Sequence, residues 1–308
     1  MARGDLYEAT ADGTVSYVDI GLYDSPEYGS VYIVDAEKPA IIDTGLGTHV
    51  DVILNALERV GISPTELHAI VPTHVHLDHA GGAGYLAEEC PNADVYCYES
   101  GAPFLLNPTS LWKGTQAVIG PRIVHYVEPK PVPEERLVPI SDGEVISLGD
   151  QRLITHHAPG HAFHQAVFEH PASNGIFVAD AAGINTPRID GVRYCSPPSD
   201  FDLEQCLEDI ELLRSLNPEQ LYYGHFGAVE TDGMLEEFAE QQMGWVEQVK
   251  EKRATLSDDE AVVEFFAERA DTIGIWDERH ARGEEQLNVR GVLEYLDAKA
   301  EYTGRRNN

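Results

Sequence analysis

The sequence is poor in lysine. Lysine occurs six times in 308 residues, at Lys38, Lys113, Lys130, Lys250, Lys252 and Lys299. Lysine and arginine together number 21 against 53 aspartates and glutamates, which gives a formal net charge of −32. Nucleic-acid backbones are bound through clustered lysine and arginine, and the clearest such pair is Arg305-Arg306 near the end of the chain. We therefore expect no nucleic-acid partner.

This acidic composition also bears on the conditions in which the protein works. So large a net charge repels itself, and concentrated salt screens that repulsion because the Debye length falls to about 3 Å at 1 M. A lysine-poor, acidic globular chain resembles the proteins of salt-loving organisms. We expect a halophilic source, with an acidic protein from an ordinary environment as the alternative.

Cysteine and long apolar runs are scarce as well. Cys90, Cys97, Cys195 and Cys206 form no CxxC pair and no dense framework, so we expect reduced thiols rather than disulfides. No run approaches the roughly 20 apolar residues that span a bilayer, and residues 1–5 lack the apolar segment of a signal peptide. We expect a cytoplasmic protein without a membrane partner.

One short stretch carries most of the chemical information. Residues 73–79 read Thr-His-Val-His-Leu-Asp-His and are followed by Ala-Gly-Gly. Histidine is the commonest protein ligand of zinc, and aspartate adds oxygen ligands. The apolar residues 67–71 before this stretch predict a buried strand, and residues 83–90 after it predict a short helix. The candidate ligands His74, His76, Asp78 and His79 are therefore expected on a strand-to-helix loop.

Further candidate ligands follow at the ends of three predicted strands. His161 comes after residues 153–157, Asp180 ends the apolar run 175–179, and His225 follows a short apolar run. Such strand ends can meet at one rim of a sheet. The same order predicts an α/β fold in which strands and helices form layers around one core.

On these motifs the chain resembles the metallo-β-lactamase superfamily, whose motif is His-x-His-x-Asp-His. The resemblance implies an αββα sandwich and two divalent metal ions, zinc first, with iron or manganese as alternatives. It implies that one ion is held by His74, His76 and His161, the other by Asp78, His79 and His225, and that Asp180 bridges the two.

The resemblance also implies a reaction. A hydroxide that bridges the two ions would attack an ester-type bond of a small molecule, such as a thioester, lactone or phosphodiester. Asp78 or a metal-bound water would protonate the leaving group. The form of the first motif, Thr-His-x-His-x-Asp-His-x-Gly-Gly, looks most like that of glyoxalase II, which hydrolyses a glutathione thioester. Glyoxalase II, however, carries Gly-Cys-Gly-Arg where residues 181–185 read Ala-Ala-Gly-Ile-Asn. We therefore expect a general metallo-hydrolase.

A different reaction is implied by a second branch of the same superfamily. Persulfide dioxygenases share the first motif but use a single iron held by two histidines and one carboxylate. In this chain those ligands would be His74, His161 and Asp180. A mononuclear-iron persulfide dioxygenase is therefore the alternative function.

The sequence predicts two parts. Residues 1–229 are expected to form the metallo-β-lactamase-fold catalytic domain, and residues 230–308 a helical C-terminal extension. Amphipathic spacing predicts helices over residues 234–253, 258–270 and 287–302, with Ser257 as an N-cap. The extension is expected to cover the active site, to form a homodimer, or both.

Further residues and segments near the motifs are expected to support the site. Asp43, which ends the predicted strand 40–42, is expected to orient a ligating histidine. The segments 101–135 and 184–200 are expected to be long loops that shape a cleft for a small-molecule substrate. His164 is expected either to line this cleft or to lie on the surface.

Overall fold

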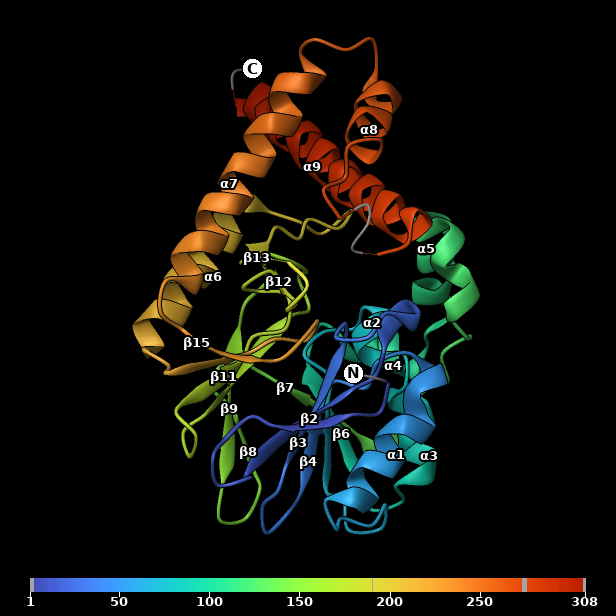
Figure 1. Ribbon diagram of the computed structural model, residues 1–308, viewed down its shortest axis with the longest axis vertical. Coiled ribbons are helices and arrows are strands. Elements are labelled where there is room, and N and C mark those ends of the chain that lie inside the picture. The colour runs from blue at the N-terminus through green and yellow to red at the C-terminus, as the bar shows by residue number, and fades with distance from the viewer. Residues whose placement is uncertain (1–2, 190, 273–275, 307–308) are drawn as a thin grey trace.

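The computed structural model describes residues 3–189, 191–272 and 276–306, and two sheets dominate it (Figure 1). The first sheet follows chain order with seven strands: β1 (Leu6–Glu8), β2 (Val15–Asp19), β3 (Ser30–Val34), β4 (Ala40–Ile42), β5 (Ala69–Val71), β6 (Asp94–Tyr98) and β7 (Leu137–Ile140). Strands β1 to β4 pair antiparallel, and β4 to β7 pair parallel.

The second sheet has six strands. Their order is β15 (Ala228–Glu230), β14 (Gln220–Tyr222), β11 (Gly175–Phe177), β10 (Ala166–His170), β9 (Arg152–His157) and β8 (Val145–Ser147). Its inner face packs on the first sheet through one apolar cluster, in which Tyr32 and Val71 of the first sheet join Phe168 and Tyr222 of the second. The two sheets therefore lie face to face, as in a sandwich.

Helices cover the outer faces of both sheets (Figure 1). Helices α1 (Val50–Arg59) and α3 (Ala83–Glu89) pack on the first sheet, and α6 (Leu203–Leu216) and α7 (Met234–Arg253) pack on the second. Helix α1 buries Val50, Ile53 and Leu57, which share one face at helical spacing. The expected αββα sandwich is confirmed.

The prediction of an irregular loop over residues 101–135 is wrong. The segment contains α4 (Ala102–Leu106), α5 (Thr109–Val118), and the 3₁₀ turns η3 (Gly120–His125) and η4 (Glu134–Arg136). Its prolines occupy positions that helices accept, because Pro103 and Pro121 lie in a first turn and Pro108 lies just before α5. Proline there loses no helical hydrogen bond.

The segment 184–200 keeps a largely irregular path, as expected. It contains a two-stranded ribbon of β12 (Ile184–Asn185) and β13 (Val192–Arg193). The ribbon lies between the second sheet and the C-terminal helices (Figure 1).

The C-terminal part consists of α7, α8 (Asp259–Ala267) and α9 (Glu278–Arg306). They share an apolar cluster with Phe201 and Cys206 of the preceding part of the chain. Helix α9 begins well before the predicted residue 287. Within the described residues, no helix is long and apolar enough to cross a membrane. The division after residue 229 stays a prediction.

The N-cap of α8 differs from the expected one. Asp258 is the capping residue, and its Oδ1 accepts a hydrogen bond from the Ala261 backbone N–H at 2.9 Å. Ser257 lies one position too early, and its hydroxyl instead donates to Asp258 at 2.9 Å.

Replacement of this cap gives a direct test. Asp258→Ala should lower the free energy of unfolding by about 1 kcal/mol, because it removes the acceptor for the first turn of α8. Ser257→Ala is the matched control and should change it by a few tenths of a kcal/mol at most. Urea unfolding followed by circular dichroism measures both, and equal losses would contradict this assignment of the cap.

Candidate metal centre

The seven predicted ligands lie at the ends of strands along one rim of the sandwich. His74 and His76 follow β5, and Asp78 and His79 belong to the short helix α2 (Leu77–Ala80). The other three, His161, Asp180 and His225, follow β9, β11 and β14 in that order. Sequence segments more than 100 residues apart therefore contribute side chains to one place.

Three histidines form the first cluster. His76 Nδ1 lies 3.0 Å from His74 Nε2 and 3.1 Å from His161 Nε2, and the three offer ligand atoms within 4.8 Å of one another. Burial lowers the pKa of His74 well below its usual value and the pKa of His161 to about 3. Neutral imidazole is the form that binds metal ions.

A second cluster lies beside the first. Asp78, His79 and His225 also offer ligand atoms within 4.8 Å of one another. Between the clusters stands Asp180, whose Oδ1 is 3.4 Å from both His79 Nε2 and His225 Nε2. Its Oδ2 is 3.5 Å from His161 Nε2. One carboxylate therefore turns one oxygen toward each cluster, as a bridging ligand would.

Asp43 contacts His79 and Thr73 beside the two clusters. Its Oδ2 is 2.8 Å from His79 Nδ1, while its Oδ1 accepts hydrogen bonds at 2.8 Å from both the backbone N–H and the hydroxyl of Thr73. Burial alone would lower the pKa of His79, but Asp180 and Asp43 together raise it to about 10. The expectation that Asp43 orients a histidine is confirmed for His79.

Thr73 has a role that its residue type does not reveal. Its hydroxyl donates to Asp43, so its oxygen remains able to accept from His74 Nδ1, 3.2 Å away. His74 then carries its proton on Nδ1, and Nε2 is left with a lone pair for a ligand. This hydrogen-bond relay sets the tautomer in the way that outer partners of metal-binding histidines do.

The donor set fits divalent metal ions. His79 Nε2 and Asp180 Oδ1 are buried and make no hydrogen bond, and they lie 3.4 Å from each other. Buried polar atoms are seldom left unpaired, and here both atoms face the clusters. Imidazole nitrogens with carboxylate oxygens suit zinc, iron and manganese alike.

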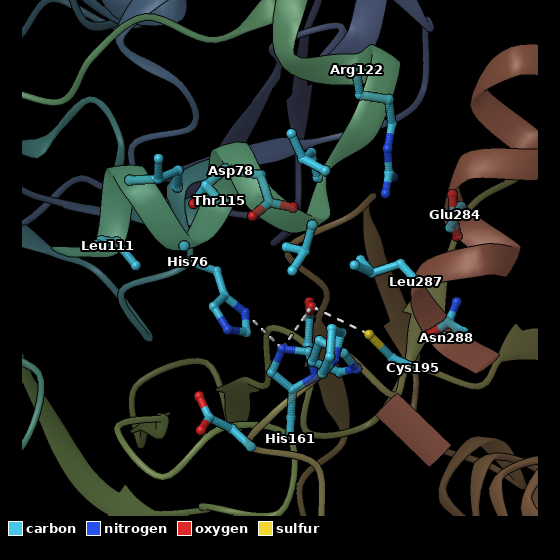
Figure 2. A pocket seen from close by; sticks show the side chains of 18 of the residues that line it. His76, Asp78, Leu111, Thr115, Arg122, His161, Cys195, Glu284, Leu287 and Asn288 are labelled. Carbon is cyan, nitrogen blue, oxygen red and sulfur yellow. Dashed lines mark hydrogen bonds and ion pairs between the residues drawn. The ribbon is translucent and has the colours of Figure 1, made fainter. Parts of the chain in front are cut away.

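The clusters open into a cleft of about 350 Å³ (Figure 2). Apolar side chains of α4 and α5, among them Phe104, Leu111 and Val118, line one wall. Leu287 of α9 and Cys195 of the segment 184–200 line another. The prediction that both segments shape the cleft is confirmed, and the helical extension, which was expected to cover the site, contributes Leu287 of α9.

Comparison with known proteins decides the family. A model described as the metallo-β-lactamase superfamily matches residues 24–225, which include all seven predicted ligands. This chain belongs to the metallo-β-lactamase superfamily.

Named relatives within the superfamily are hydrolases. The acyl-coenzyme A thioesterase MBLAC2 of Gallus gallus is 28% identical over 227 residues, covering 69% of this chain and 77% of the relative. A hydroxyacylglutathione hydrolase of Maricaulis maris is 30% identical over 157 residues, covering 51% and 48%. The crystal structure of the superfamily protein ST1585 from Sulfolobus tokodaii superposes with a TM-score of 0.66 and 23% identity, covering 87% of this chain and 94% of that one.

Other histidines near the centre take different roles. His164 lines the cleft and is buried, and its Nδ1 accepts from the Val75 backbone N–H at 3.4 Å. His156 pairs with Glu169 at 2.9 Å, and His157 lies 3.0 Å from the Phe163 carbonyl oxygen. Neither joins the superfamily ligand set.

Cys195 is a residue that the sequence did not single out. Its thiol lies 3.7 Å from Asp180 Oδ2, and burial raises its pKa well above the usual value. No spacing rule relates it to the ligand motifs, so only the folded segment 184–200 reveals the contact.

The role of Asp43 in this metallo-β-lactamase fold can be tested. Asp43→Asn should weaken metal binding by about 10- to 100-fold, because His79 loses its anionic partner. Asp19→Asn is the matched control, since Asp19 is a buried carboxylate that accepts only backbone N–H groups of Gly21 and Glu27. Titration of the metal-loaded proteins with a chromophoric chelator measures both affinities. Equal affinities for the Asp43 variant and the native protein would contradict the role.

Proposed function

We propose that the protein is a dinuclear metal-dependent hydrolase that cleaves an ester-type bond of a small molecule, and that this bond is a thioester. The observation that carries the proposal is the position of Asp180, which directs one carboxylate oxygen to each of two histidine-containing clusters. When bound, two divalent ions would lower the pKa of a water toward neutrality and polarise the scissile carbonyl.

The chain's own residues would do the remaining work. His74, His76 and His161 would hold one ion, Asp78, His79 and His225 the other, and Asp180 both. Asp78 also lines the cleft, so its carboxyl group is placed to carry a proton to the leaving group. The apolar side chains of α4 and α5 would bind the substrate and exclude water.

The choice of a thioester is supported by a relative, the acyl-coenzyme A thioesterase MBLAC2. Asp78, Asp180, Asp200 and Glu284 line the cleft, against the single arginine Arg122 among its lining residues. Two bound divalent ions would offset the charge of the ligands Asp78 and Asp180. Asp200 and Glu284 would still disfavour further anionic groups on the substrate beyond the metal centre.

The second cluster supports two ions over the single iron of a persulfide dioxygenase. A single iron would need only His74, His161 and Asp180. Asp78 and His79 belong to the motif that both enzymes share, so the support comes from His225, which completes the second cluster.

Metal removal and replacement test the proposal. Protein purified in high salt without chelators should contain about two divalent ions per chain. Dialysis against a chelator should abolish thioester hydrolysis, and added zinc or manganese should restore it. About one iron per chain, with oxygen consumption on persulfides, would instead identify the dioxygenase.

Substitution of two ligands gives an independent test. His76→Ala and Asp180→Ala should each lower kcat/KM by more than about 100-fold, because a lost ligand costs more than a lost outer partner. His156→Ala is the control, since this histidine pairs with Glu169 away from the clusters. Full activity of both ligand variants would contradict the dinuclear mechanism.

A further inference from the structure

A pair of opposite charges occupies the cleft away from the metal ligands. Arg122 comes from η3 and Glu284 from α9, so the two elements contribute one charge each. Both are only 5% exposed. Figure 2 shows the two side chains directed toward a common space beside Leu287.

The hydrogen bonds of these groups are incomplete. Arg122 Nη2 makes one long bond of 3.4 Å to the Gly283 carbonyl oxygen, and Nε has no partner. Glu284 Oε2 accepts from the Tyr28 hydroxyl at 3.3 Å and lies 3.3 Å from His280 Nε2, while Oε1 has no hydrogen-bond partner. Buried charged groups with unsatisfied atoms are costly, so both atoms favour a ligand that pairs with them.

The two charges also leave space between them. Among the described residues, no carboxylate lies within the 4.0 Å ion-pair distance of Arg122. Glu284 pairs with a histidine, His280, whereas the next glutamate of α9, Glu285, lies 3.3 Å from Arg193 and accepts from Tyr194 at 2.7 Å. Arg122 and Glu284 therefore face each other across the cleft without closing on each other.

A neutral group with one acceptor and one donor suits this space. Burial alone would raise the pKa of Glu284, but His280, Arg193 and Arg122 lower it to about 2, so the carboxylate stays ionised. A simple anion would meet Arg122 but be repelled by Glu284. A secondary amide offers a carbonyl oxygen to Arg122 and an N–H to Glu284, and it loses less hydration than a zwitterion on burial.

We propose that Arg122 and Glu284 bind a secondary amide of the substrate, a few bonds from the thioester that is cleaved. This inference rests on the proposed thioester hydrolysis and narrows its substrate class. The amide can belong to the thiol part or to the acyl part of the substrate, and the chemistry of recognition is the same in both cases.

Hydrolysis of matched pairs of substrates by the native metal-loaded protein tests the amide site. Hexanoyl N-acetylcysteamine carries the amide on the thiol side, and its ketone isostere has CH₂ in place of N–H. An N-propanoyl-β-alanyl thioester of ethanethiol and its ketone isostere place the group on the acyl side. In one of these two pairs, kcat/KM of the amide should exceed kcat/KM of the ketone by about ten-fold or more. The reason is that the amide N–H donates a hydrogen bond to a charged acceptor.

Substitutions then test whether Arg122 and Glu284 cause this difference in kcat/KM. Glu284→Gln should reduce the amide-to-ketone ratio by about five-fold, because the acceptor loses its charge. Glu285→Gln is the matched control, because it changes the adjacent buried glutamate of the same helix and should leave the ratio unchanged. Arg122→Met should lower kcat/KM for amide and ketone alike, because both keep the carbonyl, and should spare a plain alkyl thioester.

The possible outcomes separate the two proposals. Equal rates for amide and ketone on both sides, with clear hydrolysis of each, would overturn the amide site and leave the thioester hydrolase standing. Hydrolysis of none of these thioesters would contradict the proposed function and the amide site with it. An unchanged ratio in Glu284→Gln would also overturn the assignment.

Discussion

The hydrogen bonds of Asp43 are the constraint on which the rest of the site depends. This one carboxylate joins the end of β4 to the loop after β5 and to α2, through Thr73 and His79. Asp43 adopts a left-handed backbone with φ of 62°, a conformation that is uncommon outside glycine. This strained backbone conformation places the Asp43 carboxylate within hydrogen-bond distance of both Thr73 and His79. Without the Asp43 carboxylate, His79 Nδ1 would lose its partner, and the Thr73 hydroxyl that contacts His74 would lose its acceptor.

The site divides into two regions of different chemistry. Near the strand ends, imidazoles surround Asp180, and their arrangement is set by the rim of the two sheets. Farther along the cleft, apolar side chains of α4 and α5 give way to Arg122 and Glu284. The first region suits metal ions and a reacting carbonyl, and the second suits the part of the substrate that does not react.

Local motifs predicted the metal centre from the sequence, whereas the helical form of one cleft wall was not predicted. His74 to His79 and the three later ligands follow apolar runs, so strand ends could be located and expected to meet. The six prolines of residues 101–135 suggested a loop, because the positions of Pro103 and Pro121 in first turns become visible only once helix starts are known. Arg122, Cys195 and Glu284 carry no spacing relation to the ligands, since tertiary packing alone brings them to the cleft. Likewise, Asp258 and Ser257 are both good caps, and only geometry selects between them.

Helix α9 reaches the cleft from outside the part of the chain that the family model matches. The family match ends at residue 225, yet Glu284, Leu287 and Asn288 of α9 line the cleft. Codon changes at these three positions therefore alter the wall of the cleft and leave the codons of the seven predicted ligands untouched.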